Sequence, residues 1–173
     1  MTRSNNPFKV HNINYLSPSS INTYISDTPM WVARYLFNAK SQGGAGAMRG
    51  IAEEFVLSNK YEKGFFDFDL LDVKFMSLCA EANLDLGDMK TIKEKKLLKD
   101  YGNIIDKNFN YETLEDYQEK VEVEVEDLPV PIIGYIDFRF KDTIVDLKTT
   151  SRMPSKPTEA QHRQMALYSM AYP

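Results

Sequence analysis

Two runs of alternating residues, separated only by Lys141 and Asp142, constrain the fold of this chain more than any other feature. Alternation with a period of two is typical of β-strands that are buried on one face. The first run, 132–140, places four apolar side chains on one face: Ile132, Ile136, Phe138 and Phe140. Its other face carries Tyr135, Asp137 and Arg139. In the second run, 143–149, Val145 and Leu147 point to the core, whereas Ile144, Asp146 and Lys148 point away. The pattern predicts a β-hairpin.

The length of the turn brings two acidic residues of this hairpin together. If Lys141 and Asp142 form a two-residue turn, Phe140 pairs with Thr143, and counting back places Asp137 opposite Asp146. Lys-Asp is not a favoured sequence for such a turn. Carboxylates that face each other across two strands repel, at a cost of a few tenths to ~1 kcal/mol. A divalent cation between them would remove this cost, so one interpretation is a metal site. The alternative is an exposed hairpin with scattered charges. The sequence of the hairpin by itself favours neither interpretation.

Short motifs along the rest of the chain favour the metal site. An upstream Gly50 stands four residues before Glu54, and a downstream Gln164 stands four residues before Tyr168. Near the start are Leu16-Ser17-Pro18-Ser19-Ser20 and a looser group of Pro29, Trp31, Arg34 and Tyr35. With Gly134-Tyr135-Ile136-Asp137 and Asp146-Leu147-Lys148-Thr149, these motifs resemble those of the PD-(D/E)XK nucleases, in particular the RecB-like branch that includes phage and mitochondrial genome-maintenance exonucleases. The order of the motifs matches, and they span residues 16–168.

The resemblance implies both a fold and an activity. The expected fold is α/β, with a small mixed β-sheet flanked by helices in a restriction-endonuclease-like core that carries N-terminal and inserted helices. The expected activity is that of a metal-dependent DNA exonuclease, which hydrolyses phosphodiester bonds in single-stranded DNA or at DNA ends. Two alternatives remain open. One is a module of the same fold that has no catalytic activity and acts in nucleic-acid binding or in the assembly of a complex. The other is an endonuclease that uses the same site.

The resemblance also implies roles for particular residues. The expected catalytic residues are Glu54, Asp137, Asp146, Lys148, Gln164 and Tyr168. Oxygen ligands suit Mg²⁺ or Mn²⁺, and the expected ligands are the carboxylates of Glu54, Asp137 and Asp146 with the backbone carbonyl of Leu147. Lys148 would orient the attacking water or stabilise the transition state. The expected DNA contacts are Ser17, Ser19, Arg34, Arg49 and His162.

The chain departs from the family pattern at three points. Many RecB-like nucleases have His where this chain has Glu54, and the Glu is more similar to the phage enzymes. The single cysteine, Cys79, excludes a four-cysteine iron–sulfur cluster and an intrachain disulfide, and it suggests a cytoplasmic protein. Relatives usually continue beyond the Gln-x-x-x-Tyr helix, so this chain is expected to be either a minimal member or a shortened one.

Length and composition predict one domain over residues 1–173, because 43% of the residues are hydrophobic, and the resemblance implies that this is a nuclease domain. Within it we expect a flexible arm over residues 1–14 and a helical insertion over residues 65–119. Helices are predicted over 18–26 and 29–38, where Ser17 and Thr28 can cap the starts and Pro18 and Pro29 stand at the first helical position. Further helices are predicted around Met48–Val56 and, in the insertion, around 70–82, 89–101 and 111–120. The helix around Met48–Val56 has an apolar stripe that includes Ile51 and Ala52, with Glu54 at its flank. A half-buried strand is predicted over 120–127, where Val and Glu alternate.

Charge and aromatic content bear on the expected partner, DNA. A net charge of −4 argues against a generally basic nucleic-acid surface, although a local basic groove remains compatible with it. The lysines of residues 89–101 could line a DNA path, but a solvated helix face is the more usual role. Platforms for base stacking could be among five aromatic residues near the start of the chain: Tyr15, Tyr24, Trp31, Tyr35 and Phe37. Most of these side chains are expected to be buried in the core instead. No apolar run reaches the length of a membrane span.

Overall fold

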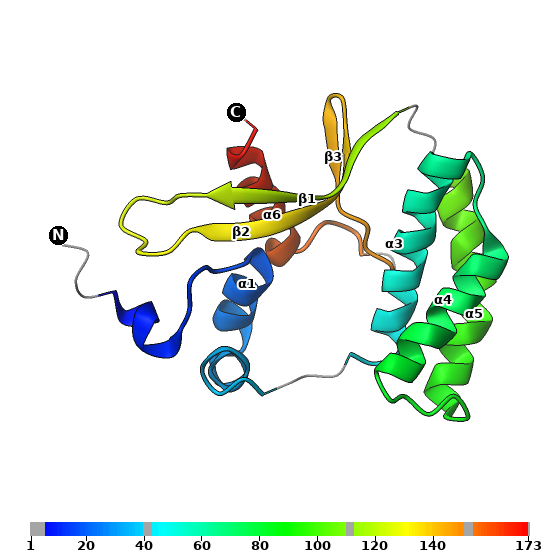
Figure 1. The fold of residues 1–173 in the computed structure, drawn as a ribbon, viewed down its shortest axis with the longest axis horizontal. Helices are drawn as coiled ribbons and strands as arrows, with labels where there is room; N and C mark the ends of the chain where they lie inside the picture. The colour runs from blue at the N-terminus through cyan, green and yellow to red at the C-terminus, as the bar shows by residue number, and fades with distance from the viewer. Residues whose placement is uncertain (1–5, 40–42, 110–112, 151–153, 173) are drawn as a thin grey trace. The chain divides into compact units, whose positions relative to one another are not determined.

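The computed structural model describes residues 6–39, 43–109, 113–150 and 154–172, and it divides the chain into two compact units. The first unit comprises Met1–Ser41, Gln118–Ile136 and Arg152–Pro173, and the second comprises Gln42–Tyr117 and Asp137–Ser151. The described residues form helices and a small antiparallel sheet in the order β1-β2-β3 (Figure 1). The strands are β1 (Leu114–Val123), β2 (Ile132–Phe140) and β3 (Thr143–Val145). This confirms the broad α/β class, whereas the restriction-endonuclease-like core and the single domain stay predictions.

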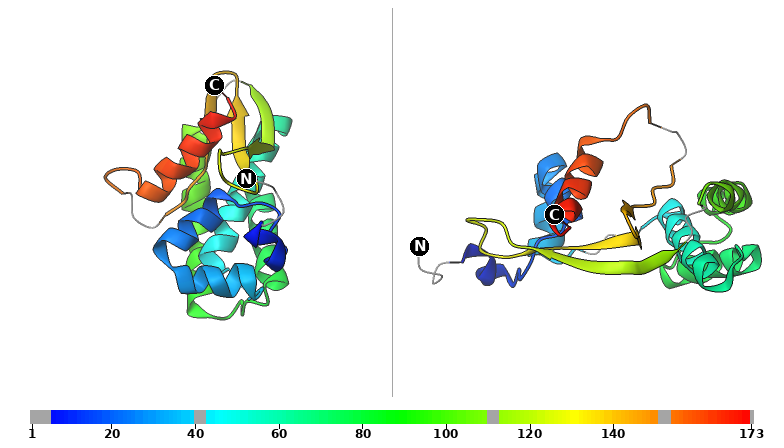
Figure 2. Two further views of the ribbon diagram at one scale, coloured as in Figure 1. Left: turned by 90° about the vertical axis from the view of Figure 1, so that its left-hand side faces the viewer. Right: turned by 90° about the horizontal axis from the view of Figure 1, so that it is seen from above.

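Three helices that contact one another make up most of the second unit: α3 (Ala45–Lys63), α4 (Phe68–Glu81) and α5 (Met89–Asn108). They lie side by side in each view (Figures 1 and 2). Side chains of Asp67 and Asp88 cap the starts of α4 and α5, and α3 ends at Gly64, whose φ of 83° suits glycine. The core of this unit is formed by Ala45, Ala52, Val56, Leu57, Phe66, Leu71, Phe75, Cys79, Leu98, Ile105, Phe138 and Phe140.

The helices of the insertion follow the prediction up to residue 109, and α5 is longer than predicted. The helix predicted over 111–120 is wrong, because β1 begins at Leu114; residues 110–112 lie outside the described part of the chain. Leu114 and Tyr117 are three residues apart, a spacing typical of a helix. In the structure Gln118 has a φ of 55°, and this irregularity shifts the alternation of the strand. The later alternation is confirmed at Val121 and Val123, which are buried, but the strand ends there rather than at residue 127.

The first unit contains shorter helices: η2 (Pro7–His11), α1 (Pro18–Ser26), α2 (Thr28–Trp31), η3 (Val32–Leu36) and α6 (Glu159–Met170). Helix α1 begins as predicted, with Ser17 and Ser20 in a capping box. Asp27, rather than the expected Thr28, caps α2, which continues into the π-helical η3. Within the arm predicted over 1–14, η2 is an ordered turn of 3-10 helix, and residues 1–5 lie outside the described part. None of the described helices has the length and apolarity to cross a membrane.

Candidate functional site

The β-hairpin has the register that the sequence predicts. Phe140 pairs with Thr143, Arg139 with Ile144 and Phe138 with Val145, in antiparallel orientation. Asp137 and Asp146 are the next two residues in this register, directly beyond the last pair. The second strand is shorter than predicted, because β3 ends at Val145 and residues 146–150 have no regular secondary structure.

Asp137 occupies the centre of a group of charged side chains in the second unit. The residue is only 8% exposed, and the backbone N–H of Leu147 donates a hydrogen bond to its Oδ2 at 2.8 Å. Burial, followed by the negative charges of Glu54 and Asp146, raises the pKa of Asp137 to about 7. The positive charge of Lys148 and the Leu147 N–H act in the opposite direction. Two predicted site carboxylates therefore lie close enough to Asp137 to act on its proton.

Helix α3 supplies the second carboxylate, Glu54. Its side chain is half-buried, and the hydroxyl of Tyr117 donates a hydrogen bond to its Oε1 at 3.2 Å. Burial, and then the charge of Glu54, raises the pKa of Tyr117, which keeps this hydroxyl protonated and able to donate. The predicted position of Glu54 at the flank of the apolar stripe is confirmed, since Ala52 and Val56 on the same helix are fully buried.

Asp146 and Lys148 form an ion pair in the segment that follows β3. The side chain of Asp146 is 8% exposed, whereas that of Lys148 is 48% exposed. Lys148 is thus the member of the group that solvent, or a substrate, can reach. Leu147 donates its N–H to Asp137, and the role of its carbonyl as a metal ligand stays a prediction.

The donor chemistry of this group suits a hard divalent cation, because carboxylate oxygens are the ligands that Mg²⁺ and Mn²⁺ prefer. Burial is the main cause of the raised pKa of Asp137, and the negative charges of Glu54 and Asp146 add a repulsion that such a cation would relieve. Within the described residues, however, no three His, Cys, Asp or Glu side chains are arranged closely enough to hold a metal ion. The carboxylates therefore act on one another electrostatically in this structure without forming a closed set of ligands.

A buried ionic cluster beside this group was missed by the sequence analysis. Glu53 is completely buried, and its pKa is raised to about 7, chiefly by burial and against the effect of Arg49. The Nε of Arg49 lies 3.6 Å from Glu53 and 3.4 Å from Glu94, and its guanidinium stacks on the ring of Tyr101 at 3.8 Å. The i, i+4 spacing of Arg49 and Glu53 was the feature of the sequence that could have predicted this ion pair. Arg49, predicted to contact DNA, is only 4% exposed and serves this cluster instead.

Gln164 and Tyr168 belong to the first unit and form a hydrogen-bonded chain there. The amide Nε2 of Gln164 donates to the Tyr168 hydroxyl at 3.0 Å, and that hydroxyl donates to the carbonyl oxygen of Tyr135 at 2.7 Å. Tyr168 is 4% exposed and rests against Gly134, where a Cβ would lie 2.6 Å from the ring. Their spacing on one helix face is confirmed, and their part in catalysis stays a prediction.

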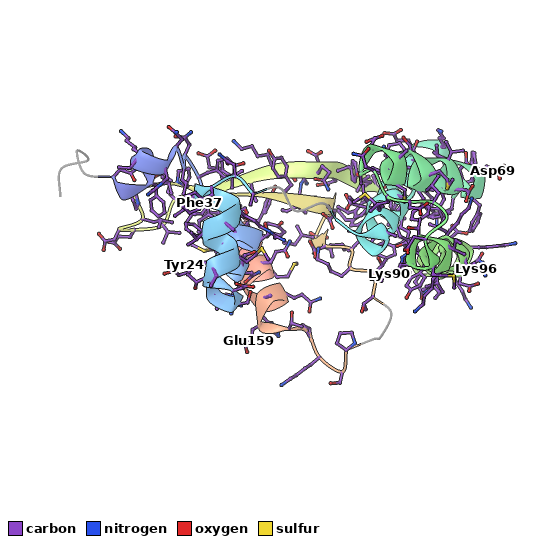
Figure 3. The ribbon with its side chains drawn as sticks, turned by 90° about the horizontal axis from the view of Figure 1, so that it is seen from below. Tyr24, Phe37, Asp69, Lys90, Lys96 and Glu159 are labelled. Atoms are coloured by element: carbon purple, nitrogen blue, oxygen red, sulfur yellow. The ribbon has the colours of Figure 1, made fainter. Side chains whose placement is uncertain are left out.

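The other predicted DNA contacts lie in different environments. Ser17 caps α1 and its hydroxyl lies 2.9 Å from that of Ser19. His162 is exposed on α6, and Arg34 is half-buried on η3. The lysines of residues 89–101 are all exposed, in agreement with a solvated face: Lys90, Lys93, Lys95, Lys96 and Lys99. Figure 3 labels Lys90 and Lys96. Most of the five aromatic residues near the start of the chain were expected to be buried in the core. This expectation is wrong, since Tyr15, Tyr24 and Phe37 are more than half exposed.

Comparisons with known proteins identify no relative: no family model, no curated protein and no solved structure matches this chain.

Proposed function

We propose that this protein is a metal-dependent nuclease that hydrolyses phosphodiester bonds in DNA, with single-stranded DNA or DNA ends as its substrate. The observation that carries the proposal is the environment of Asp137, a buried carboxyl whose pKa is raised to about 7 by burial and by Glu54 and Asp146, with Lys148 beside it. Clusters of carboxylates with strongly shifted pKa values are more common at functional sites than elsewhere. The motif resemblance to RecB-like nucleases supports the same reading.

In this proposal each side chain has a separate task. Glu54, Asp137 and Asp146 would hold Mg²⁺ or Mn²⁺ once drawn closer together than they are in this structure, and the bound ion would supply an activated water and neutralise charge on the phosphate. The N–H of Leu147 orients one oxygen of Asp137, and the Tyr117 hydroxyl orients Glu54. Lys148, with its half-exposed side chain, stabilises the charge that develops on the phosphoryl oxygens. Gln164 and Tyr168 stay predicted catalytic residues, which the resemblance places either at the metal site or at the DNA backbone.

The test uses purified protein with end-labelled linear and circular single-stranded DNA, in Mg²⁺, Mn²⁺ or EDTA. Metal-dependent loss of the linear strand alone would support an exonuclease, and cutting of the circle as well would identify an endonuclease. Asp146→Asn and Lys148→Ala should abolish cleavage. Two residues of the same hairpin turn provide matched controls, because Lys141→Ala and Asp142→Asn change the same residue types at exposed positions.

Equal cleavage by Asp146→Asn and by Asp142→Asn would overturn the proposed site. Binding of DNA without cleavage under every metal condition would instead support the catalytically silent module. A second measurement is independent of turnover: Mg²⁺ or Mn²⁺ should raise the melting temperature of the wild-type protein and have much less effect on Asp146→Asn. An equal rise in both proteins would place the ion elsewhere.

A further inference from the structure

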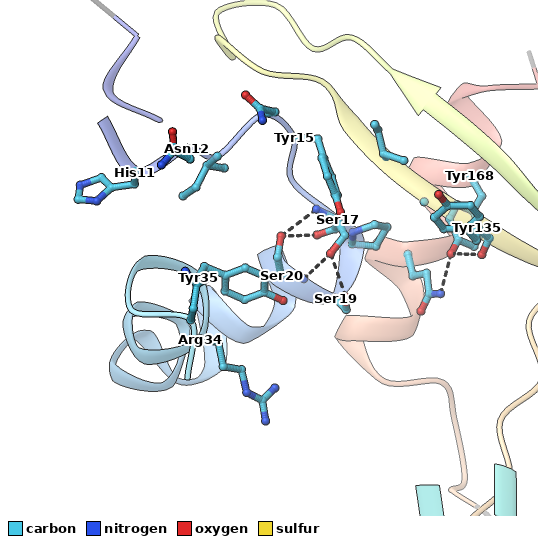
Figure 4. Close-up of a pocket in the computed structure, with 17 residues that line it drawn as sticks. His11, Asn12, Tyr15, Ser17, Ser19, Ser20, Arg34, Tyr35, Tyr135 and Tyr168 are labelled. Atoms are coloured by element: carbon cyan, nitrogen blue, oxygen red, sulfur yellow. Dashed lines mark hydrogen bonds between the residues drawn. The ribbon is translucent and has the colours of Figure 1, made fainter. Parts of the chain in front are cut away.

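A cavity of about 690 Å³ lies within the first unit, which contains none of the three proposed metal-binding carboxylates. Its walls come from residues 11–15, the start of α1, η3, residues 133–135 of β2, and two residues of α6 (Figure 4). This volume falls within the range of about 300–1,000 Å³ that is typical of sites for small molecules and cofactors. The cavity is therefore large enough for a ligand the size of a nucleotide.

The charges around this cavity are all of one sign. The chain has 25 Asp and Glu residues, yet the described residues that line the cavity include none of them. They do include Arg34. In a protein with a net charge of −4, a cavity whose described lining has a cationic side chain and no acidic one favours an anionic ligand.

Arg34 is the group best suited to bind that anion. Its Nε is buried and has no hydrogen-bond partner among the described residues. A buried guanidinium nitrogen without a partner is costly, and a phosphate oxygen is a favourable acceptor for it. The hydroxyls of Ser17 and Ser19, which also line the cavity, add further hydrogen-bonding groups.

Aromatic side chains supply the second kind of recognition. Tyr15, Tyr35, Tyr135 and Tyr168 all line the cavity, and Figure 4 shows them around it. Tyr15 is 53% exposed and Tyr135 is 51% exposed, so their rings remain available for stacking. Asn12, Asn14 and Asn38 offer amides that can both donate and accept hydrogen bonds, as base edges require. A cation, exposed aromatic rings and amides together match a nucleotide better than a simple anion.

We infer that this cavity binds one nucleotide of a single-stranded nucleic acid, with its phosphate on Arg34 and its base against Tyr15. The inference rests on the proposed function, because the strand held here is the one that the carboxylate group would cleave. Its test does not depend on cleavage, since binding is measured in EDTA.

The only tryptophan of the chain provides the readout. The Trp31 ring lies 5.5 Å from the ring of Tyr35, which lines the cavity, so a ligand there should change the Trp31 fluorescence. We would titrate the protein with a short oligothymidylate, thymidine monophosphate, thymidine and inorganic phosphate. The oligothymidylate and the monophosphate should both change the fluorescence, the oligothymidylate at the lower concentration. Thymidine and phosphate should each bind at least about tenfold more weakly than the monophosphate.

Two variants separate the phosphate contact from the base contact. Arg34→Gln should weaken oligothymidylate binding about tenfold and reduce the slope of log affinity against log salt by about 1. Tyr15→Leu should weaken binding about tenfold without changing that slope. Lys156→Gln and Phe37→Leu are matched controls, because both residues are exposed, belong to the first unit and do not line the cavity.

Four outcomes would overturn the inference. The first is that both Arg34→Gln and Tyr15→Leu bind oligothymidylate as tightly as the wild type, and the second is that oligothymidylate binds without changing the Trp31 fluorescence. The third is that phosphate binds as tightly as the monophosphate. The fourth is that the monophosphate binds and the oligothymidylate does not. Failure of the proposed nuclease would look different. In that case Arg34→Gln would still weaken binding in EDTA, but no metal would produce cleavage by the wild-type protein.

Discussion

Glu53 and Glu54 are consecutive residues of one helix, yet they occupy different environments. Successive residues of an α-helix are rotated by about 100°, so Glu53 faces the buried side of α3 while Glu54 reaches Tyr117 at its flank. Burial raises the pKa of Glu53 to about 7. The carboxylate proposed for chemistry is thus beside one that serves the ionic cluster with Arg49 and Glu94.

At Asp137 the raised pKa makes stability depend on pH. The carboxyl of Asp titrates near 3.8 in the unfolded chain and near 7 in the folded protein, so between these values the folded state holds more protons and stability falls as pH rises. Asp137→Asn cannot ionise and keeps an acceptor for the Leu147 N–H. In metal-free buffer it should exceed the wild type in stability by roughly 1–2 kcal/mol at pH 8, after allowance for solvent screening.

Urea unfolding of both proteins from pH 4 to pH 8 measures this difference. The advantage of Asp137→Asn should disappear as the pH falls towards 4. A difference that stays constant over the whole range would show that Asp137 does not carry the shifted proton.

Gly134 permits the close approach of a buried ring. A Cβ at this position would lie 2.6 Å from Cε1 of Tyr168, which is 4% exposed and has little room to move. Gly134→Ala should therefore destabilise the protein by about 1–3 kcal/mol in thermal unfolding. Gly46→Ala, in α3, is the matched control, because its Cβ would meet only the side chain of Glu94 at ordinary distances of 3.8–4.0 Å and a helical alanine should hold or raise stability. Equal melting temperatures for the two variants would contradict this account.

At the scale of elements, the segment after β3 is irregular but held at several points. The Leu147 N–H bonds to Asp137, the Tyr101 hydroxyl donates to the carbonyl of Thr150 at 2.8 Å, and the hydroxyl of Thr149 would lie 3.3 Å from a Cβ at Gly50. Lys148 lies between these contacts. Its position therefore depends on α3 and α5 as well as on strand β2.

Tyr101→Phe tests this dependence, because it removes the hydroxyl and keeps the ring that stacks on Arg49. We expect a loss of about 0.5–1.5 kcal/mol in the free energy of unfolding. With the proposed DNA substrate, kcat should fall while KM changes little, since the hydroxyl acts through the position of Lys148. Tyr24→Phe, at an exposed position of α1, should change neither quantity. A Tyr101→Phe enzyme with unchanged kcat would separate the Thr150 contact from catalysis.

At the scale of the whole molecule, the hydrophobic core identified above belongs entirely to the second unit. Amides in regions of dense burial open mainly through global unfolding and exchange slowly with solvent. Hydrogen exchange should therefore be slowest in α3 around Ala52–Leu57 and fast in α2 and η3, where no described residue is fully buried. Faster exchange in α3 than in η3 would be incompatible with this core.

Phe75→Ala should be among the most damaging single substitutions. The Phe75 side chain is fully buried on α4, and truncation of such a residue to Ala costs about 3–5 kcal/mol. Val73→Ala on the same helix removes apolar atoms at a position that is 65% exposed and should cost little. Denaturant unfolding followed by circular dichroism compares the two. A similar loss in both variants would mean that α4 does not contribute to the core in this way.

Much of the local structure could be predicted from the sequence. The alternation of residues 132–145 predicted the hairpin register, Ser17 and Pro18 predicted the start of α1, and Glu54 was placed correctly at the flank of its helix. Each of these depends on neighbouring residues, on turn length or on capping chemistry. Ile51 belongs to the predicted apolar stripe but is 45% exposed, since the sequence does not reveal which edge of the stripe meets the neighbouring helices.

The sequence by itself determined the elements whose pattern is local: the hairpin, the capped helices, and the position in the chain of Asp137, Asp146 and Lys148. Only the tertiary structure decided which distant groups meet. It buried Arg49 with Glu53 and Glu94, brought Tyr117 to Glu54, and placed Arg34, whose buried Nε has no hydrogen-bond partner among the described residues, in the wall of a cavity that four tyrosines also line. The physical reason is that periodicity and capping act over a few residues. Burial, pKa shifts and cavities depend on packing between segments that are far apart in the chain.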